Sequence, residues 1–285
     1  MTTLPFQQVD VFTTVPFKGN AVAVVLDGDA LSIEQMQAIA RWTNLSETTF
    51  VCSATNPGAD YRLRIFTPRS ELSFAGHPTI GSAHAALRRG LKPKATGRLV
   101  QECGKGLVEI ALEGERLFFA LPDAELRDPD PAQLVRLADA FSVAVTDIRC
   151  GAIIDVGPVW FTVQLASGEA VLALRPDMDK LLGLTPIGIT GVTVFGLYGS
   201  DAATDLEVRS FAPAEGVPED PVCGSGNGCV AALVRREGFF TDRQYLASQG
   251  RSVGRDGRVA VRFAEDGTIW VGGHSVTCVD GALTV

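Results

Sequence analysis

The sequence has no uninterrupted apolar run of about 18 residues, the length that a membrane-spanning helix needs. It also lacks a long run of lysine or arginine. The Arg pairs at 88–89 and 235–236 are too short to form a basic face, and the formal net charge is −8. Proteins that follow a nucleic-acid backbone normally carry such a face. We therefore expect no membrane span and no nucleic-acid partner, and a small molecule as ligand.

Paired cysteines are absent as well. The six cysteines stand at 52, 103, 150, 223, 229 and 278, and no two of them form a C-x-x-C pair. This spacing argues against a zinc site or a redox pair, so no metal is expected. The opening MTTLPFQQVD has neither a basic segment nor an apolar one, as a secretory signal would. We expect a cytoplasmic protein with reduced thiols.

Nucleotide-binding loops are also missing: there is no G-x-x-x-x-G-K-[ST], and no G-x-G-x-x-G after a first strand. Short strand-like runs dominate instead, namely FQQVDVFT, AVAVVL, TFVCSA, YRLRIFT, VEIAL and RLFFAL. SIEQMQAIARW predicts a helix whose capping box pairs Ser32 with Gln35. PAQLVRLADAF predicts another, with Pro131 in its first turn, and CVAALV predicts a helix buried on all sides. Regular βαβ units are absent, so the fold class is α+β.

The chain repeats itself once. R-x-F-x-P at 64–68 recurs at 209–213, and each copy is followed by P-x-x-G-S, an apolar helix and an Arg pair. The offset is 145 at the Arg, 143 at Gly-Ser and 147 at the Arg pair. A weaker echo pairs NLSETTFV with ITGVTVFG. We predict two pseudo-symmetric domains, 1–122 and 123–273, the second an internal repeat of the first. A ligand is expected in the cleft between them.

Each copy contains a Gly-rich turn at a helix start, AGHPTIGSA at 75–83 and DPVCGSGNG at 220–228. The first N–H groups of a helix have no partner within it and carry partial positive charge. Such a turn can hold a carboxylate, a phosphate or an oxyanion. Ordinary helix capping explains either turn alone, whereas two related turns favour a paired anion site.

Several side chains near these turns could take part in a reaction. Glu47 lies between a predicted helix and an apolar strand, where burial can raise a carboxyl pKa and suit it to acid–base chemistry. The alternative is a solvated loop residue. His77 could bind substrate or relay a proton, or be a satisfied polar group. Asp220 could be a capping residue. Cys223 precedes a helix start, where the pKa of a thiol is depressed, so it could be a nucleophile or a general base. Because no partner thiol is evident, a small buried filler is the favoured interpretation.

Several blocks together resemble the PhzF-like phenazine-biosynthesis family. They are VDVFTTVPFKGNAVAVV, NLSETTFV, FTPRSELSFAGHPTIGSA, EDPVCGSGNG and SQGRSVGRDGRV, in order from residue 6 to about 262. The resemblance implies the diaminopimelate epimerase fold, in which each domain is a curved, mostly antiparallel sheet around a central helix. It also implies a homodimer, and a last strand, about 274–285, that returns to the first domain.

The resemblance further implies an isomerase that shifts a proton on a small carboxylate-bearing substrate without metal or organic cofactor. The catalytic residues of the family fall on Glu47, His77, Asp220 and Ser225. Its substrate contacts fall on Gly76, Pro78, Thr79, Gly224, Gly226, Asn227, Cys223 and Asn20.

Two departures from related patterns matter. Two-cysteine racemases place a cysteine at each turn, but here Ala75 occupies the first place and only Cys223 remains. A paired-thiol mechanism is therefore not expected. Ala21 replaces a proline of the family pattern, which affects turn geometry rather than chemistry. A one-cysteine epimerase using Cys223 and a non-catalytic ligand-binding protein stay open as alternatives.

Overall fold

The computed structural model describes residues 2–285, and the chain divides into two compact units. The first unit runs to Ala120 and also contains Gly272–Val285, and the second is Leu121–Val271. Strand β17 (Ile269–Gly273) passes from the second unit into the first. Each unit is described by itself below.

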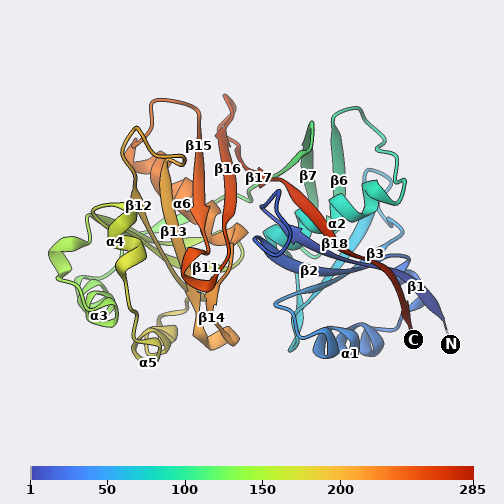
Figure 1. The fold of residues 1–285 in the computed structure, drawn as a ribbon, viewed down its shortest axis with the longest axis horizontal. Coiled ribbons are helices and arrows are strands. Elements are labelled where there is room, and N and C mark those ends of the chain that lie inside the picture. Colours follow the sequence, from blue (N-terminus) through green and yellow to red (C-terminus); the bar gives the residue numbers. More distant parts are fainter. Residues whose placement is uncertain (1) are drawn as a thin grey trace. The chain divides into compact units, whose positions relative to one another are not determined.

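The first unit is a mixed sheet around one buried helix (Figure 1). Its elements are β1 (Thr3–Val11), β2 (Asn20–Val25), α1 (Ile33–Thr43), β3 (Thr48–Cys52), β4 (Tyr61–Phe66), β5 (Glu71–Leu72), α2 (Gly76–Arg88), β6 (Arg98–Cys103), β7 (Gly106–Glu113), β8 (Arg116–Ala120) and β18 (Ser275–Thr284). Antiparallel pairs predominate, and the parallel ones are β2 with β3 and β4 with β6.

The second unit is also a mixed sheet around one helix. Its elements are β9 (Glu125–Arg127), α3 (Pro131–Phe141), β10 (Cys150–Asp155), β11 (Val159–Gln164), α4 (Gly168–Ala173), α5 (Met178–Leu182), β12 (Gly191–Leu197), β13 (Leu206–Ala212), β14 (Val217–Asp220), α6 (Gly224–Glu237), β15 (Gln244–Gln249) and β16 (Gly257–Phe263). Its parallel pairs are β11 with β12 and β13 with β15. Neighbouring strands in the first unit alternate between antiparallel and parallel pairing in the order β1, β2, β3, β4, β6, β7. Neighbouring strands in the second unit alternate in the same way in the order β10, β11, β12, β13, β15, β16.

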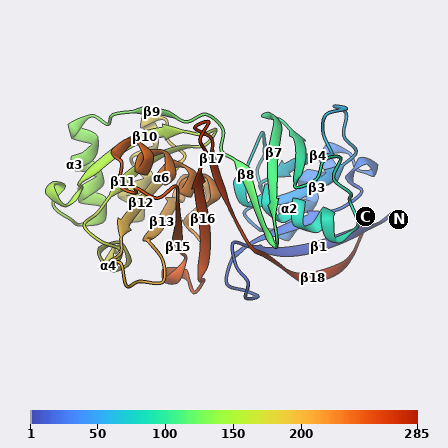
Figure 2. The same ribbon diagram turned by 90° about the horizontal axis from the view of Figure 1, so that it is seen from above.

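The central helices are α2 and α6, each inside the curved strands of its own unit (Figure 2). In α6 every residue from Gly226 to Val234 is buried, which confirms the helix predicted to be covered on all sides. In α2 a Cβ added to Gly81 would lie 2.4 Å from a methyl group of Val22. Only glycine lets the helix approach β2 this closely.

The other two predicted helices are confirmed together with their caps. The hydroxyl of Ser32 accepts a hydrogen bond from the backbone N–H of Gln35, and the Gln35 side chain accepts one from the Ser32 N–H. In α3, Pro131 stands at the first position behind the capping residue Asp130. Both helices cover the outside of their sheets with one apolar face.

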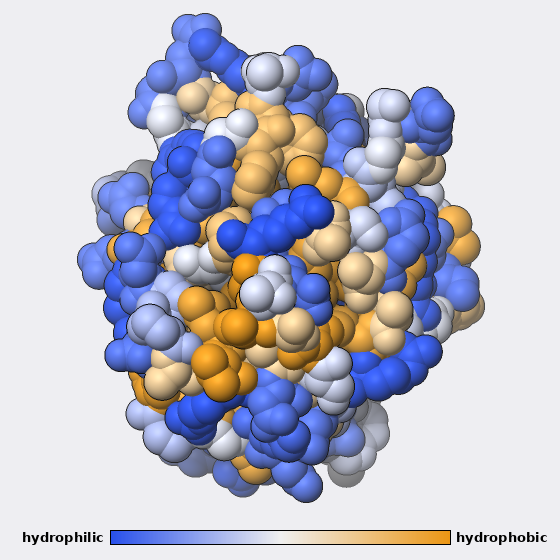
Figure 3. All heavy atoms as spheres, turned by 90° about the vertical axis from the view of Figure 1, so that its left-hand side faces the viewer, coloured by the Kyte–Doolittle hydropathy of each residue, from blue (hydrophilic) through white to orange (hydrophobic). Residues whose placement is uncertain are grey.

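The core of the second unit reaches its surface near α3 and α5. Figure 3 shows an apolar area among hydrophilic residues on the face seen from that side. Exposed apolar side chains of these helices are Val135 and Leu182. The main cluster beneath them includes Leu137, Phe141 and Phe161.

An Arg–Glu brace occurs in both units at the repeated R-x-F-x-P block. Arg64 donates two hydrogen bonds of 2.7 Å to Glu71, and Arg209 donates two, of 2.9 and 2.8 Å, to Glu219. The brace in the second unit is far more buried, with 6% and 10% of its side chains exposed against 20% and 40% in the first. Each Arg also lies over the Phe two residues later.

The Arg–Glu braces and the starts of the central helices show that the predicted repeat aligns part of the two units incorrectly. The Arg offset is 145, but α2 and α6 begin at Gly76 and Gly224, an offset of 148. Their terminal glycines, Gly90 and Gly238, are also 148 apart. The two P-x-x-G-S segments, which are 143 residues apart, therefore do not occupy equivalent structural positions. The three extra residues lie between Arg209 and Glu219, because that pair is 10 residues apart and the first pair is 7.

Candidate active site

Glu47 and His77 meet in the first unit. Glu47 precedes β3, just after α1 ends at an Asn44 in the left-handed conformation, and His77 is the second residue of α2. The Oε2 atom of Glu47 lies 3.3 Å from Nε2 of His77, with 16% and 5% of the side chains exposed. Neither atom has a partner in hydrogen-bond geometry among the described residues. The pair is therefore at ion-pair distance, in an arrangement that a bound ligand can tighten.

Asn20 determines the tautomer of His77. The Asn20 amide nitrogen lies 3.3 Å from Nδ1 of His77, and a side-chain NH₂ can only donate. Nδ1 is therefore the acceptor, so the proton of the neutral ring is on Nε2, facing Glu47. Asn20 is buried, with 2% exposed, which places it behind the histidine. Its predicted contact with a substrate stays a prediction.

His77 is held neutral by its surroundings. Burial lowers the pKa of its imidazole, and the charges of Glu47 and Asp10 oppose that shift without cancelling it. Asp10 is itself buried on β1 and accepts a hydrogen bond of 3.0 Å from the Gly19 backbone. Sequence analysis missed Asp10. Its signal was a charged residue inside the apolar strand VDVF.

The start of α2 offers backbone donors. Its N-cap residue, Ala75, has no side chain that could cap the helix. Pro78 has no N–H, and the Thr79 N–H is directed to the Ala75 carbonyl at 3.2 Å. The Thr79 hydroxyl accepts from Gln101 in the interior. The N–H groups of Gly76 and His77 are thus the ones suited to an anion, while Pro78 and Thr79 shape the turn.

The turn of the second unit is capped by Cys223, not by Asp220. The Sγ atom of Cys223 accepts a hydrogen bond of 3.2 Å from the Gly226 N–H. Asp220 ends β14, and its carboxylate accepts a hydrogen bond from the Val222 N–H at 3.0 Å. The capping interpretation of Asp220 is therefore wrong, because the helix starts four residues later.

Cys223 fits the interpretation as a small buried residue better than that as an activated thiol. Burial raises the pKa of its thiol well above the ordinary value, and the charge of Asp220 adds to the rise. Hydrogen bonds from Ser225 and Gly226 act in the opposite direction and are smaller. Only 4% of Cys223 is exposed, so desolvation outweighs the helix start.

Ser225 is the second residue of α6. Its Oγ accepts a hydrogen bond of 3.0 Å from the indole Nε1 of Trp160 on β11, and lies 3.6 Å from Sγ of Cys223. Sequence analysis missed Trp160, which is 65 residues away and lies in an ordinary apolar strand. No pattern in the sequence indicated this contact.

Gln249 holds the second turn from behind. Its carbonyl oxygen accepts from the Cys223 N–H at 3.1 Å and from the Asn227 amide at 2.8 Å. Its own amide donates to the Asp220 carbonyl at 3.0 Å. Gln249 and Asn227 are fully buried. The donors of Gly226 and Asn227 are thus used inside the unit, and their predicted contacts with a substrate stay predictions, as does that of Gly224. The block SQGRSVGRDGRV was the signal for Gln249.

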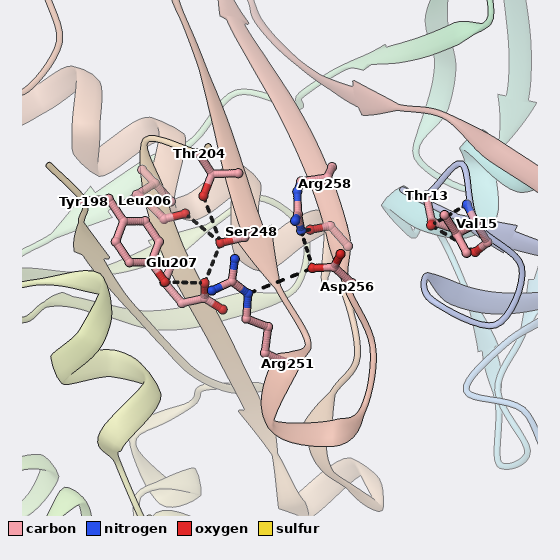
Figure 4. Close-up of polar contacts among 11 residues, drawn as sticks. Thr13, Val15, Tyr198, Thr204, Leu206, Glu207, Ser248, Arg251, Asp256 and Arg258 are labelled. Carbon is pink, nitrogen blue, oxygen red and sulfur yellow. Dashed lines mark hydrogen bonds and ion pairs between the residues drawn. The ribbon is translucent and has the colours of Figure 1, made fainter. Parts of the chain in front are cut away.

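Ser248, the neighbour of Gln249 on β15, points to a buried carboxylate (Figure 4). Its hydroxyl donates to Oε2 of Glu207, which also accepts from the Tyr198 hydroxyl at 2.8 Å. Burial raises the pKa of Glu207 and, together with the Glu207 carboxylate, raises that of Tyr198 to about 12. These side chains contact one another within the sheet of the second unit. The cluster was not predicted from the sequence.

Several further features of residues 2–285 bear on the chemistry of the chain. The six cysteines are all free thiols. No three His, Cys, Asp or Glu side chains in this range gather as metal ligands would. No helix there has the length and apolar character to cross a bilayer. Nε2 of His84 lies at hydrogen-bond distance, 3.0 Å, from the Thr277 hydroxyl, and burial lowers the pKa of the imidazole to about 4.

Comparison with known proteins identifies the family. The family described as PhzC-PhzF, phenazine biosynthesis-like protein, matches residues 9–281. The chain belongs to this family. A PhzF-family protein of Bacillus anthracis has the same fold, with a TM-score of 0.87 at 25% identity over the whole of both chains. The expected fold class is thereby confirmed.

Curated relatives of this PhzF-family chain carry different names. "Antisense-enhancing sequence 1" of Schizosaccharomyces pombe is 40% identical over 99% of both chains. The trans-2,3-dihydro-3-hydroxyanthranilate isomerase of Pseudomonas chlororaphis is 34% identical over 97% of this chain and 98% of its own. A hydroxyproline epimerase of Agrobacterium vitis, at 13% identity and a TM-score of 0.66, shares the fold only. Of the two relatives named here with 30% identity or more, one carries the name of an isomerase.

Proposed function

We propose that the protein is a PhzF-family isomerase that moves a proton between two carbons of a small carboxylate-bearing substrate. The observation that carries the proposal is the Glu47–His77 contact at the uncapped start of α2. It places a base, a neutral donor and free backbone N–H groups together in one unit. Relatives named as isomerases support the same reaction class.

The reaction begins when the Glu47 carboxylate removes a proton from a carbon whose anion can delocalise into a neighbouring carbonyl or double bond. The electron pair of the broken C–H bond moves into that conjugated system. The backbone N–H groups of Gly76 and His77 stabilise the negative charge at the helix start. While the anion is held, the carboxyl proton of Glu47 exchanges with solvent, and Glu47 then delivers a proton to a second carbon. Substrate and product have the same atoms and oxidation level, so no co-reactant is consumed.

His77 supports this cycle without becoming charged. Because Asn20 fixes the proton on Nε2, the ring can donate to Glu47 and stabilise its carboxylate before the first transfer and after the second, while Glu47 is a neutral carboxylic acid between them. Asp220 and Ser225 are proposed to orient the substrate. That the two Gly-rich turns contact one substrate stays a prediction, as do the homodimer and the cytoplasmic location.

Deuterium exchange tests the proposed function. The intact protein is incubated in D₂O with trans-2,3-dihydro-3-hydroxyanthranilate, the compound named for a relative, and with a set of small amino and hydroxy acids. We expect one compound to gain deuterium at carbon, seen as a one-unit mass increase. If none of them exchanges faster than in protein-free buffer, the proposed function is wrong.

The reactivity of Cys223 separates the proposal from a one-cysteine epimerase. Since burial raises its pKa, the thiol is protonated at pH 7.5, and only the thiolate reacts with iodoacetamide. We expect Cys223 to react at least about tenfold more slowly than the half-buried Cys278, with a rate that rises as the pH increases. Peptide mass mapping at successive times gives both rates in one sample. Preferential labelling of Cys223 would instead support the epimerase.

A ligand-binding protein without turnover is the second candidate function. It is favoured by the relative that is 40% identical, because "Antisense-enhancing sequence 1" does not name an enzyme. The complete set of Glu47, His77, Asp220 and Ser225 argues for retained chemistry. The exchange experiment distinguishes the two, since a binding protein would give no deuterated product.

A further inference from the structure

The second residue of each central helix is held by a donor from the equivalent strand. His77 and Ser225 are both second residues, 148 apart like the helix starts. Asn20 begins β2 and Trp160 is the second residue of β11. The two strands are equivalent, because each pairs in parallel with the next strand, β2 with β3 and β11 with β12. Each unit therefore holds the second residue of its central helix with a donor from the equivalent strand, although Asn20 is the first residue of its strand and Trp160 is the second.

The support in the second unit has only one possible direction. An indole Nε1–H is a donor with no acceptor capacity, whereas a serine hydroxyl has two lone pairs and one hydrogen. At 3.0 Å the Trp160 proton fills one lone pair of Ser225 Oγ. The hydroxyl hydrogen of Ser225 must then point away from Trp160. Within the unit it can point to Cys223 Sγ, at 3.6 Å.

The indole is firmly positioned by its packing. Trp160 is 3% exposed. A Cβ added to Gly191, on the neighbouring strand β12, would lie 2.8 Å from the indole ring. The ring cannot turn away without moving that strand, so its N–H stays directed at Ser225.

We infer that Trp160 is a positioning residue that fixes Ser225 as a hydrogen-bond donor toward the substrate. The inference rests on the proposed function, because it assigns Ser225 the task of donating to the substrate anion. The Cys223 thiol is a weak acceptor for the Ser225 hydroxyl. A charged oxygen of the substrate forms a stronger hydrogen bond and can replace it. Trp160 thus plays for Ser225 the part that Asn20 plays for His77.

A double-mutant cycle with Trp160→Phe and Ser225→Ala tests this. Phenylalanine keeps most of the ring and removes the N–H. We expect Trp160→Phe to lower the deuterium-exchange kcat about tenfold and to change KM less than about twofold, because the donor direction matters most in the transition state. In the Ser225→Ala background the same change should have almost no further effect. Trp42→Phe, at a residue that is 75% exposed, is the matched control.

Indole NMR signals show whether the contact itself exists. The chain has three tryptophans, so ¹⁵N-labelled protein gives three side-chain N–H signals. The signal absent from Trp160→Phe should shift in Ser225→Ala, while the other two stay. An unchanged signal, a wild-type kcat for Trp160→Phe, or equal losses in both serine backgrounds would overturn the inference. Loss of exchange in Glu47→Gln alongside any of these results would leave the proposed function standing. Absence of exchange in the wild-type protein would overturn both.

Discussion

Glu47→Gln is expected to lower deuterium exchange at least about 1000-fold, the upper part of the range for a lost general acid–base group. The amide has nearly the same shape and cannot take up a proton from carbon. Its contact with His77 can persist, since the ring N–H that faces residue 47 can donate to the amide oxygen. Exchange is measured by mass spectrometry with the compound that the wild-type protein labels.

Two controls show whether the loss of exchange in Glu47→Gln comes from the missing carboxylate. Glu115→Gln, at an exposed position between β7 and β8, should keep wild-type exchange. The thermal midpoint of Glu47→Gln should stay within about 2 °C of the wild type, so that the loss cannot come from unfolding. Exchange within tenfold of the wild type would remove Glu47 from the role of proton carrier.

Arg209→Met should destabilise the protein by about 3–5 kcal/mol, the cost of breaking a buried ion pair on one side. The change leaves the Glu219 carboxylate in the interior without its cation. It also removes the hydrogen bonds of 3.2 and 2.9 Å that Arg209 donates to the carbonyls of Val171 and Leu174. Methionine fills most of the same volume, so the loss reflects charge and hydrogen bonding rather than a cavity.

The matched control is Arg64→Met in the first unit. It breaks the equivalent brace with the same bidentate geometry, but there 20% of Arg64 and 40% of Glu71 are exposed. Water can solvate the remaining carboxylate, so the expected loss is about 1 kcal/mol or less. Urea unfolding followed by far-ultraviolet circular dichroism gives both values. Equal losses for the two variants would contradict the assignment of the difference to burial.

Much of the local structure could be predicted from the sequence, because its causes are local. The cap of α1 needs only Ser32 and Gln35, three residues apart, and Pro131 marks the start of α3. The all-round burial of α6 follows from an uninterrupted apolar segment. The strand-rich pattern predicted the α+β class, and the family resemblance assigned catalytic roles to Glu47 and His77, a pair that the structure brings to 3.3 Å.

The parts that sequence analysis missed depend on contacts between distant residues. Trp160 and Gln249 reach the second turn from 65 and 26 positions away in the chain. A helix start is a local feature that lowers the pKa of a thiol, whereas the burial that raises the pKa of Cys223 is set by the whole unit. The predicted alignment of the two units was incorrect for a related reason. Three extra residues in the second unit shift the start of its central helix, and the similar P-x-x-G-S segments do not reveal this shift.

The pairing of β1 with β18 has a consequence for the order of synthesis. Thr3 of β1 lies opposite Thr284 of β18, so β1 receives this neighbour only after the second unit has been synthesised. The second unit, Leu121–Val271, is complete before that neighbour exists. Domains made on the ribosome generally fold as units once their residues have emerged. The internal unit is therefore the first whose full sequence is available for folding. Until β18 has been synthesised, the first unit keeps one edge of β1 open to unwanted strand pairing.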